Sequence, residues 1–204
     1  MTRFTTAMVA GALIAATALP GATSSSAQLK READSRGDVE RVTENPDGTT
    51  DRVDRPRHRD GDIVSIQATH GDRRVYVVVR YADLIRRADM QLRAPVRAFK
   101  GGEARQYQIR SANGTSDDRL NRPLLLVGDN PADMSDTGCR AVEASVDFAA
   151  DVWRASVSRS CLGRPYSVVV ATQYFRQLSF DVDTETYLWD RHRVNVRLHR
   201  GQQR

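Results

Sequence analysis

The sequence predicts an all-β protein, an antiparallel β-sandwich or jelly roll with about eight to ten strands and at most short helical turns. Three observations lead to this prediction. Apolar and polar side chains alternate with period two in several segments, turn residues recur between those segments, and no long stretch has the period of an amphipathic helix. Because isolated hairpins are unstable in water, we expect the segments to pack face to face over their apolar sides.

Residues 1–27 have the pattern of a Sec signal peptide. Arg3 supplies a positive charge, residues 7–19 are apolar and uncharged, and residues 25–27 have small side chains ahead of a cleavage point. The apolar run is shorter than a membrane span requires, and no later run is long and apolar enough to cross a bilayer. We therefore expect a secreted, extracellular chain with no membrane span after removal of the signal.

Residues 28–59 form a polar N-terminal arm, and residues 60–204 are expected to form a single β-sandwich domain. The arm has few apolar side chains, which is typical of a segment that cannot order by itself. It also contains a strong turn, Asn45-Pro46-Asp47-Gly48, between two short β-prone runs. Two interpretations stay open, an edge hairpin docked on the main domain and a flexible arm.

The clearest hairpin pattern lies in residues 60–84. Two β-rich runs, 63–69 and 75–81, flank a turn at Gly71-Asp72, and in each run the apolar side chains fall on one face. Residues 81–87 are expected to form one helical turn. Further strands are predicted over residues 91–99, 104–110, 123–127, 166–174, 175–181, 187–189 and 193–199.

Cys139 and Cys161 bracket another predicted hairpin. A short turn near Ala149-Ala150 would pair Val142 with Val157 and Val146 with Trp153, so that apolar side chains meet on one face. This register misses a direct Cys139–Cys161 pairing by one residue, which a bulge or a flared strand end would correct. Since an exported chain with two cysteines favours a disulfide, we expect Cys139 and Cys161 to be bonded, with a stabilisation of about 3 kcal/mol.

The charge pattern argues against nucleic acid as a partner. The net charge is +5, but arginine is interleaved with aspartate along almost the whole chain, and lysine occurs only at positions 30 and 100. A nucleic-acid-binding protein normally clusters its cations into a stripe or tail. We interpret the charges as a solvated surface and expect no nucleic-acid binding.

No catalytic residue is assigned. The chain has no G-x-S-x-G motif, and its four histidines, at positions 58, 70, 192 and 199, lack the spacing of a metal pair on a helix. The 26 acidic residues always permit some pair at the separation that glycoside hydrolysis requires, so their presence decides nothing. No cofactor is expected apart from calcium as a weak candidate.

Calcium is considered because acidic residues cluster in predicted loops, where their hard oxygen atoms suit this ion. One further acidic pair is Asp34 and Asp38. Thr186 stands where an EF-hand loop requires glycine, which favours ordinary charged turns as the alternative. The candidate ligands are Asp129, Asp133 and Asp136 in one cluster and Asp181, Asp183 and Glu185 in another.

Two aromatic residues are candidates for a ligand platform, because aromatic rings stack on the faces of sugars. Trp189, between polar residues near a turn, is the surface candidate, together with Tyr187. Trp153 lies on the apolar face of its predicted strand and is expected in the core.

The signal peptide, the segments DSRGDVERV and VSRSCLGRPYSVVV, and the central hairpin together resemble small secreted actinobacterial β-sandwich proteins of uncharacterised function. The resemblance implies export and an all-β fold, and it brings no activity or site residues. The favoured hypothesis is an exported non-enzymatic module that binds a cell-envelope polymer or protein. The alternatives are a secreted hydrolase that uses loop carboxylates and a structural or inhibitor-type protein. The oligomeric state stays open.

Overall fold

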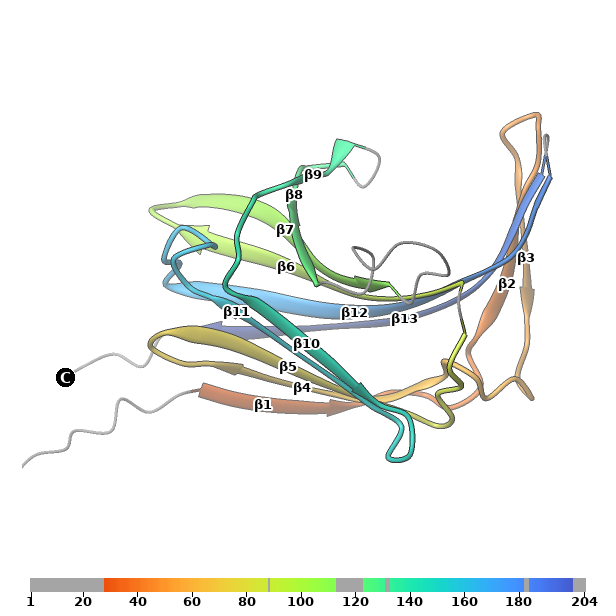
Figure 1. Cartoon of the computed structure of the whole chain (residues 1–204), viewed down its shortest axis with the longest axis horizontal. Helices are drawn as coiled ribbons and strands as arrows, with labels where there is room; N and C mark the ends of the chain where they lie inside the picture. The colour runs from red at the N-terminus through yellow and green to blue at the C-terminus, as the bar shows by residue number, and fades with distance from the viewer. Residues whose placement is uncertain (1–27, 88, 113–122, 131–132, 182–183, 200–204) are drawn as a thin grey trace, which may run out of the picture.

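The computed structural model describes residues 28–87, 89–112, 123–130, 133–181 and 184–199, and these form two packed antiparallel sheets (Figure 1). Thirteen strands and no α-helix occur in these residues. The predicted all-β sandwich is therefore confirmed. No helix that could span a membrane is found in the same residues. The predicted signal peptide lies outside them.

The smaller sheet, sheet A, has five strands in the order β1-β4-β5-β11-β10. They are β1 (Gln28–Ala33), β4 (Ile63–His70), β5 (Arg74–Tyr81), β11 (Val152–Ser158) and β10 (Val142–Asp147).

The larger sheet, sheet B, has eight strands in the order β3-β2-β13-β12-β6-β7-β8-β9. They are β3 (Thr50–Asp54), β2 (Glu40–Glu44), β13 (Thr184–His199), β12 (Ser167–Asp181), β6 (Met90–Lys100), β7 (Glu103–Ala112), β8 (Leu124–Val127) and β9 (Ser135–Asp136).

The predicted hairpins occur where the turn residues placed them. β4 pairs with β5, β6 with β7, and β10 with β11, each pair antiparallel. The runs 166–174 and 175–181 join into the single strand β12, and the last two predicted runs join into β13. The β12–β13 pair accommodates this length with register shifts between Val170 and Thr172 and between Gln177 and Ser179.

The N-terminal segment takes part in both sheets. β1 pairs with β4 at one edge of sheet A. The Asn45–Gly48 turn joins β2 to β3, and β2 pairs with residues 185–189 of β13. The β2–β3 hairpin therefore forms one edge of sheet B, in the part of that sheet that extends past sheet A (Figure 1).

The core lies between the inner faces of the two sheets. Trp153 and Tyr174 are its largest fully buried side chains, so the predicted core position of Trp153 agrees with the structure. The valines that alternate along β5 supply much of the sheet A side: Val75, Val77 and Val79 are completely buried. Burial of such side chains is the main favourable contribution to the free energy of folding.

The predicted helical turn over residues 81–87 is wrong. Several backbone amides of this segment donate to distant acceptors, so they are not available for the i−4 bonds of a helix. The N–H of Ala82 donates to the Asp62 carbonyl at 2.8 Å, and that of Leu84 to the Asp151 carboxylate at 2.8 Å. Residues far away in the sequence therefore hold the segment in an irregular, non-helical conformation.

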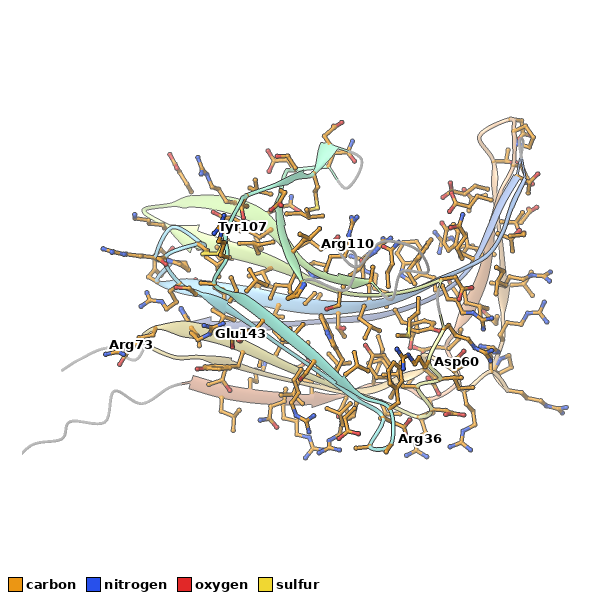
Figure 2. The ribbon with its side chains drawn as sticks, viewed as in Figure 1. Arg36, Asp60, Arg73, Tyr107, Arg110 and Glu143 are labelled. Atoms are coloured by element: carbon orange, nitrogen blue, oxygen red, sulfur yellow. A yellow bond between two sulfur atoms is a disulfide. The ribbon has the colours of Figure 1, made fainter. Side chains whose placement is uncertain are left out.

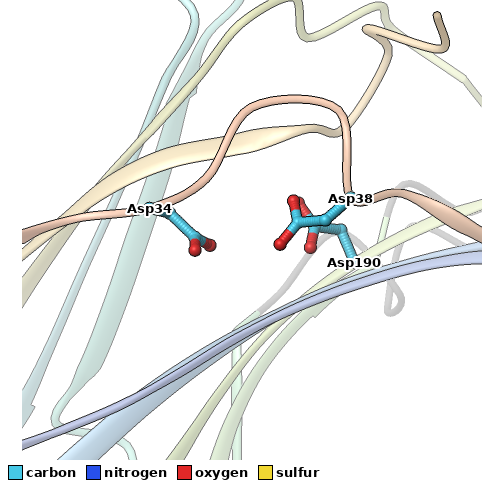
Figure 3. Close-up of side chains that lie close together, drawn as sticks. All are labelled: Asp34, Asp38 and Asp190. Carbon is cyan, nitrogen blue, oxygen red and sulfur yellow. The ribbon is translucent and has the colours of Figure 1, made fainter. Parts of the chain in front are cut away.

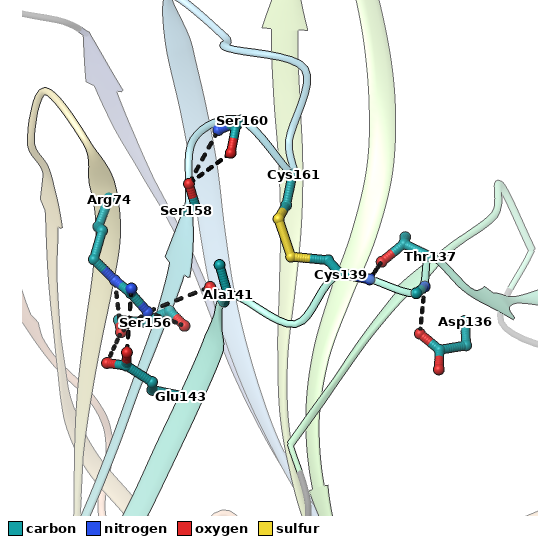
Figure 4. The surroundings of a disulfide bond; sticks show 11 residues. Arg74, Asp136, Thr137, Cys139, Ala141, Glu143, Ser156, Ser158, Ser160 and Cys161 are labelled. Atoms are coloured by element: carbon teal, nitrogen blue, oxygen red, sulfur yellow. Dashed lines mark hydrogen bonds and ion pairs between the residues drawn. A yellow bond between two sulfur atoms is a disulfide. The ribbon is translucent and has the colours of Figure 1, made fainter.

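The predicted disulfide is present. Cys139 and Cys161 are bonded, with their Cα atoms 6.0 Å apart (Figure 4). The pairs Val142–Val157 and Val146–Trp153 occur in the predicted register. The two cysteines lie beyond the paired ends of β10 and β11. Cys161 belongs to the turn that follows β11 and Cys139 to the irregular segment before β10, so strand register does not limit their approach. A disulfide fits an extracellular protein, because such bonds persist in oxidising compartments.

A junction around Asp60 and Gly61 fixes sheet B against sheet A. Gly61 has φ +82°, and a Cβ atom there would lie 2.2 Å from the ring of Tyr174 on β12. Asp60 is 5% exposed, and its carboxylate accepts a hydrogen bond from the Tyr174 hydroxyl at 3.3 Å and pairs with Arg176 at 3.2 Å. This close approach orients β12, whose opposite face carries the site described next.

Candidate functional site

The outer face of sheet B, which points away from sheet A, is concave. Figure 1 shows that β7, β8 and β9 curl up at one side of this face, while β2, β3 and the adjoining end of β13 rise at the other. Between them lies a groove with a volume of about 320 Å³. Its lining comes from four neighbouring strands and consists of Glu44, Arg93, Gln173, Phe175, Glu185, Tyr187 and Trp189.

Three aromatic rings form a row in this groove. Phe175 and Tyr187 have ring centroids 4.8 Å apart, and those of Tyr187 and Trp189 are 6.0 Å apart. Strand geometry explains the row. Tyr187 and Trp189 are two residues apart on β13 and share a face, and Phe175 is the direct partner of Trp189 on β12. The predicted platform residues Tyr187 and Trp189 thus lie together, joined by Phe175. Tyr187 is only 6% exposed, so the ring faces open to a ligand are those of Phe175 and Trp189, which are half-buried.

Polar contacts hold the aromatic row in place. The Tyr187 hydroxyl donates a hydrogen bond of 2.8 Å to the Glu44 carboxylate, and burial together with this bond raises the pKa of Tyr187. The guanidinium carbon of Arg93 lies 4.5 Å from the Phe175 ring centroid, and that of Arg52 lies 5.3 Å from the Trp189 ring. Cation–π contacts therefore bracket the row.

Two Gln-x-Arg units continue the site on β6 and β7. Arg93 donates to the side-chain oxygen of Gln91 at 2.7 and 3.1 Å, and Arg110 donates to that of Gln108 at 3.1 and 3.2 Å. Figure 2 shows Arg110 on the concave side of sheet B. In each unit a glutamine amide fixes one edge of a guanidinium, because residues two apart on a strand share a face.

Both guanidinium groups are partly removed from water. Burial lowers the pKa of Arg93 to about 10, with a further contribution from the positive charge of Arg110. Burial also lowers the pKa of Arg110. Both groups nevertheless stay protonated at neutral pH, so two positive charges face each other across adjacent strands.

A second group of interest consists of Asp34, Asp38 and Asp190, whose carboxylate oxygen atoms lie within 4.8 Å of one another (Figure 3). Asp190 is 2% exposed and accepts a 2.5 Å hydrogen bond from the N–H of Ile63. Burial raises the pKa of Asp190 to about 8, and the charges of Asp38, Asp34 and Asp62 act in the same direction. Such a set of oxygen atoms could hold a divalent cation.

The calcium candidates are distributed differently from expectation. Asp34 and Asp38 lie together, joined by Asp190, which sequence reasoning did not include. Asp129, Asp133 and Asp136 are exposed, and the Asp136 carboxylate accepts a hydrogen bond from the N–H of Gly138 at 2.9 Å. Glu185 lines the aromatic groove. The side chains of Asp181, Asp183, His192 and His199 lie outside the described part.

Another hollow, of about 430 Å³, lies where the β6–β7 turn approaches the loop after Cys161. Its lining includes Lys100, Glu103, Arg105 and Leu162, and Tyr107 is its single aromatic residue. Tyr107 is 4% exposed and belongs to the core, so this hollow presents no free ring face. The groove on sheet B is therefore the better candidate site.

Sequence reasoning missed Phe175, Arg93 and Arg110. A usable signal was present, because the triplets Gln91-Leu92-Arg93 and Gln108-Ile109-Arg110 occur in two strands predicted to form one hairpin. Comparisons with family models, curated proteins and solved structures gave no match for the chain.

Proposed function

We propose that this protein is an exported, non-enzymatic module that binds a glycan of the cell envelope or the medium in the groove of sheet B. The observation that carries the proposal is the row of Phe175, Tyr187 and Trp189. The apolar face of a sugar ring packs on aromatic faces, and binding sites combine such faces with a few placed polar groups. Here Gln173, Glu44 and Glu185 are available for sugar hydroxyls.

The side chains of the groove are held in fixed positions, which supports binding by a preformed surface. Each ring lies on a strand in the middle of a sheet, and neighbouring guanidinium and carboxylate groups contact the rings. A ligand therefore meets side chains whose conformations are already restricted, which reduces the entropy cost of binding. Export is supported by the disulfide and by the signal pattern in residues 1–27.

A glycan array followed by calorimetry on the best ligand tests this function. We expect Trp189→Ala and Phe175→Ala each to weaken binding by about tenfold, or about 1.4 kcal/mol, because each removes a stacking surface. Tyr76→Ala is the matched control, since Tyr76 is 46% exposed on sheet A, outside the groove. Equal losses in all three variants, or no glycan bound, would contradict the proposal.

Intrinsic fluorescence gives a second measurement. The chain has two tryptophans, of which Trp153 is completely buried and Trp189 lines the groove. We expect a bound glycan to change the emission of the protein, and Trp189→Phe to abolish that change while Trp153 still emits. A change that persists in Trp189→Phe would place the ligand elsewhere.

A second candidate function is glycoside hydrolysis, favoured by the placement of Glu44 and Glu185. The two residues are direct partners on β2 and β13, and both line the groove. Side chains that are directly opposite point to the same face of a sheet, so both carboxylates face one groove, as a catalytic carboxylate pair requires. Turnover of a bound glycan that is lost in both Glu44→Gln and Glu185→Gln would favour hydrolysis over binding alone.

A further inference from the structure

A row of arginines crosses the outer face of sheet B next to the aromatic row. Strand pairing places Arg191 opposite Gln173, Gln173 opposite Arg93, and Arg93 opposite Arg110. Direct partners in a sheet point to the same face, so the four side chains lie on one line across β13, β12, β6 and β7. The adjacent line contains Trp189 and Phe175.

The arrangement of Arg93 and Arg110 is unfavourable without a counterion. Like charges directly opposite on paired strands repel, and both groups are partly desolvated. Within the described parts of the chain, neither arginine forms an ion pair with a carboxylate. Each is instead held by a neutral glutamine oxygen, which orients the guanidinium. Glu185 in the same groove raises the pKa of Arg93, but burial and the charge of Arg110 outweigh it, so the pKa is lowered overall.

The glutamines also leave the donors needed for an anion. Each one accepts hydrogen bonds from the Nε and one Nη of its arginine, and within the described residues no hydrogen bond is made by the second Nη. Gln108 is 4% exposed, which fixes it and thereby the direction of Arg110. Two oriented guanidinium groups on adjacent strands match an anionic group with several oxygen atoms, such as a carboxylate or a sulfate.

We propose that the Arg93–Arg110 pair binds the acidic substituents of a glycan whose sugar rings stack on Phe175 and Trp189, so that the ligand of the groove is an acidic polysaccharide. This inference rests on the proposed glycan-binding function and names its ligand class. The cationic line and the aromatic line lie side by side on the same face, so one sugar unit can reach both.

The acidic residues of the groove favour this ligand over a nucleic acid. Glu44 and Glu185 lie on the β2–β13 side of the aromatic rings, whereas Arg93 and Arg110 lie on the β6–β7 side. A strand with a phosphate on every nucleotide would bring negative charge near both carboxylates. A glycan can present its acidic groups toward the arginines and its hydroxyls toward the glutamates.

The test compares polygalacturonate with its fully methyl-esterified form, which has the same backbone without the charges. Binding of the purified protein is measured by calorimetry at two salt concentrations. We expect the acid form to bind at least about tenfold more tightly, and this preference to shrink at high salt. Dextran sulfate beside dextran repeats the comparison for sulfate groups, and a single-stranded oligonucleotide is the competing polyanion.

Variants locate the effect. Arg110→Gln and Arg93→Gln are each expected to weaken binding of the acid form more than binding of the ester, and so to reduce the preference. Arg93→Gln should also weaken the ester, because Arg93 lines the groove and packs on the Phe175 ring. Arg110→Lys keeps the charge without the oriented fork and should lose part of the preference. Arg97→Gln is the matched control, because Arg97 is an exposed arginine on β6 that lies over Phe99 and does not line the groove.

The possible outcomes distinguish the acidic-ligand inference from the proposed glycan-binding function. Equal binding of the acid and the ester would overturn the acidic ligand and leave the glycan-binding function standing. Failure to bind either form, with no other glycan bound, would overturn both. An oligonucleotide that binds more tightly than the acidic glycan, or an equal loss in Arg97→Gln and Arg110→Gln, would show a general polyanion surface instead of the proposed site.

Discussion

The two faces of strand β6 differ in the interactions that their side chains make. On the inner face, Leu92, Ala94 and Val96 are at most 1% exposed and pack against the rest of the core. On the outer face, Gln91 and Arg93 are held by hydrogen bonds and stacking, and Arg93 forms no ion pair with a carboxylate in the described residues. The inner face therefore stabilises the fold, and the outer face is arranged for a ligand.

The largest expected effect lies on the inner face. Leu92→Ala should lower the free energy of unfolding by about 2–5 kcal/mol, because it removes buried methyl groups and leaves a cavity. Urea denaturation measures this change. Affinity for a groove ligand should stay unchanged in the folded variant, and a parallel loss of affinity would break the division between the two faces.

The disulfide should contribute almost as much to stability and nothing to binding. Replacing Cys139 and Cys161 together by serine should lower the free energy of unfolding by about 3 kcal/mol, since the unfolded chain gains freedom in a loop closed by residues 22 apart. Thermal and urea melts of oxidised wild type and the double variant measure the loss. No groove residue comes from these segments, so a change in ligand affinity would contradict the assignment.

Asp190, a buried acidic residue on β13, should make the free energy of unfolding depend on pH. The pKa of Asp190 is raised from 3.8 to about 8, so the folded state holds a proton that the unfolded state has lost between these values. Stability should therefore be greatest below about pH 4 for this group and fall by up to about 1.4 kcal/mol per pH unit as the pH rises toward 8.

Asp190→Asn tests this dependence, because the amide oxygen can still accept the hydrogen bond from Ile63. We expect a flatter profile of unfolding free energy between pH 5 and 8 in the variant. Asp62, whose pKa is also raised by burial, should leave a residual slope of the same sign. Identical profiles for wild type and variant would show that Asp190 does not titrate in this range.

The smallest expected effect on stability comes from the outer face. Arg110→Gln should change the free energy of unfolding by less than about 0.5 kcal/mol, because the lost repulsion with Arg93 offsets the lost hydrogen bonds to Gln108. Urea denaturation of the variant beside Arg97→Gln measures the difference. A destabilisation of more than about 1 kcal/mol would indicate that Arg110 is structural and not arranged for a ligand.

Local patterns were sufficient for much of the fold. Alternating residues in 63–81, 91–110 and 142–157 predicted three hairpins, and two cysteines in a chain with a signal-peptide pattern predicted the disulfide. The helical turn at residues 81–87 failed because its amides bond to Asp62 and Asp151, which no local rule could identify. Of the candidate site, Tyr187 and Trp189 were predicted, and Phe175, Arg93 and Arg110 were not.

The sequence by itself determined which side chains share a face of each strand and where the hairpins turn, because these depend on period-two geometry and on neighbours in the chain. Only the tertiary structure decided which strands lie side by side beyond the hairpin pairs. The site requires Gln173 beside Arg93 and Tyr187 beside Val42, and these pairings join segments that are far apart in the sequence. The physical reason is that alternation specifies a side chain's face, while packing of the whole sandwich sets its neighbour across the strand.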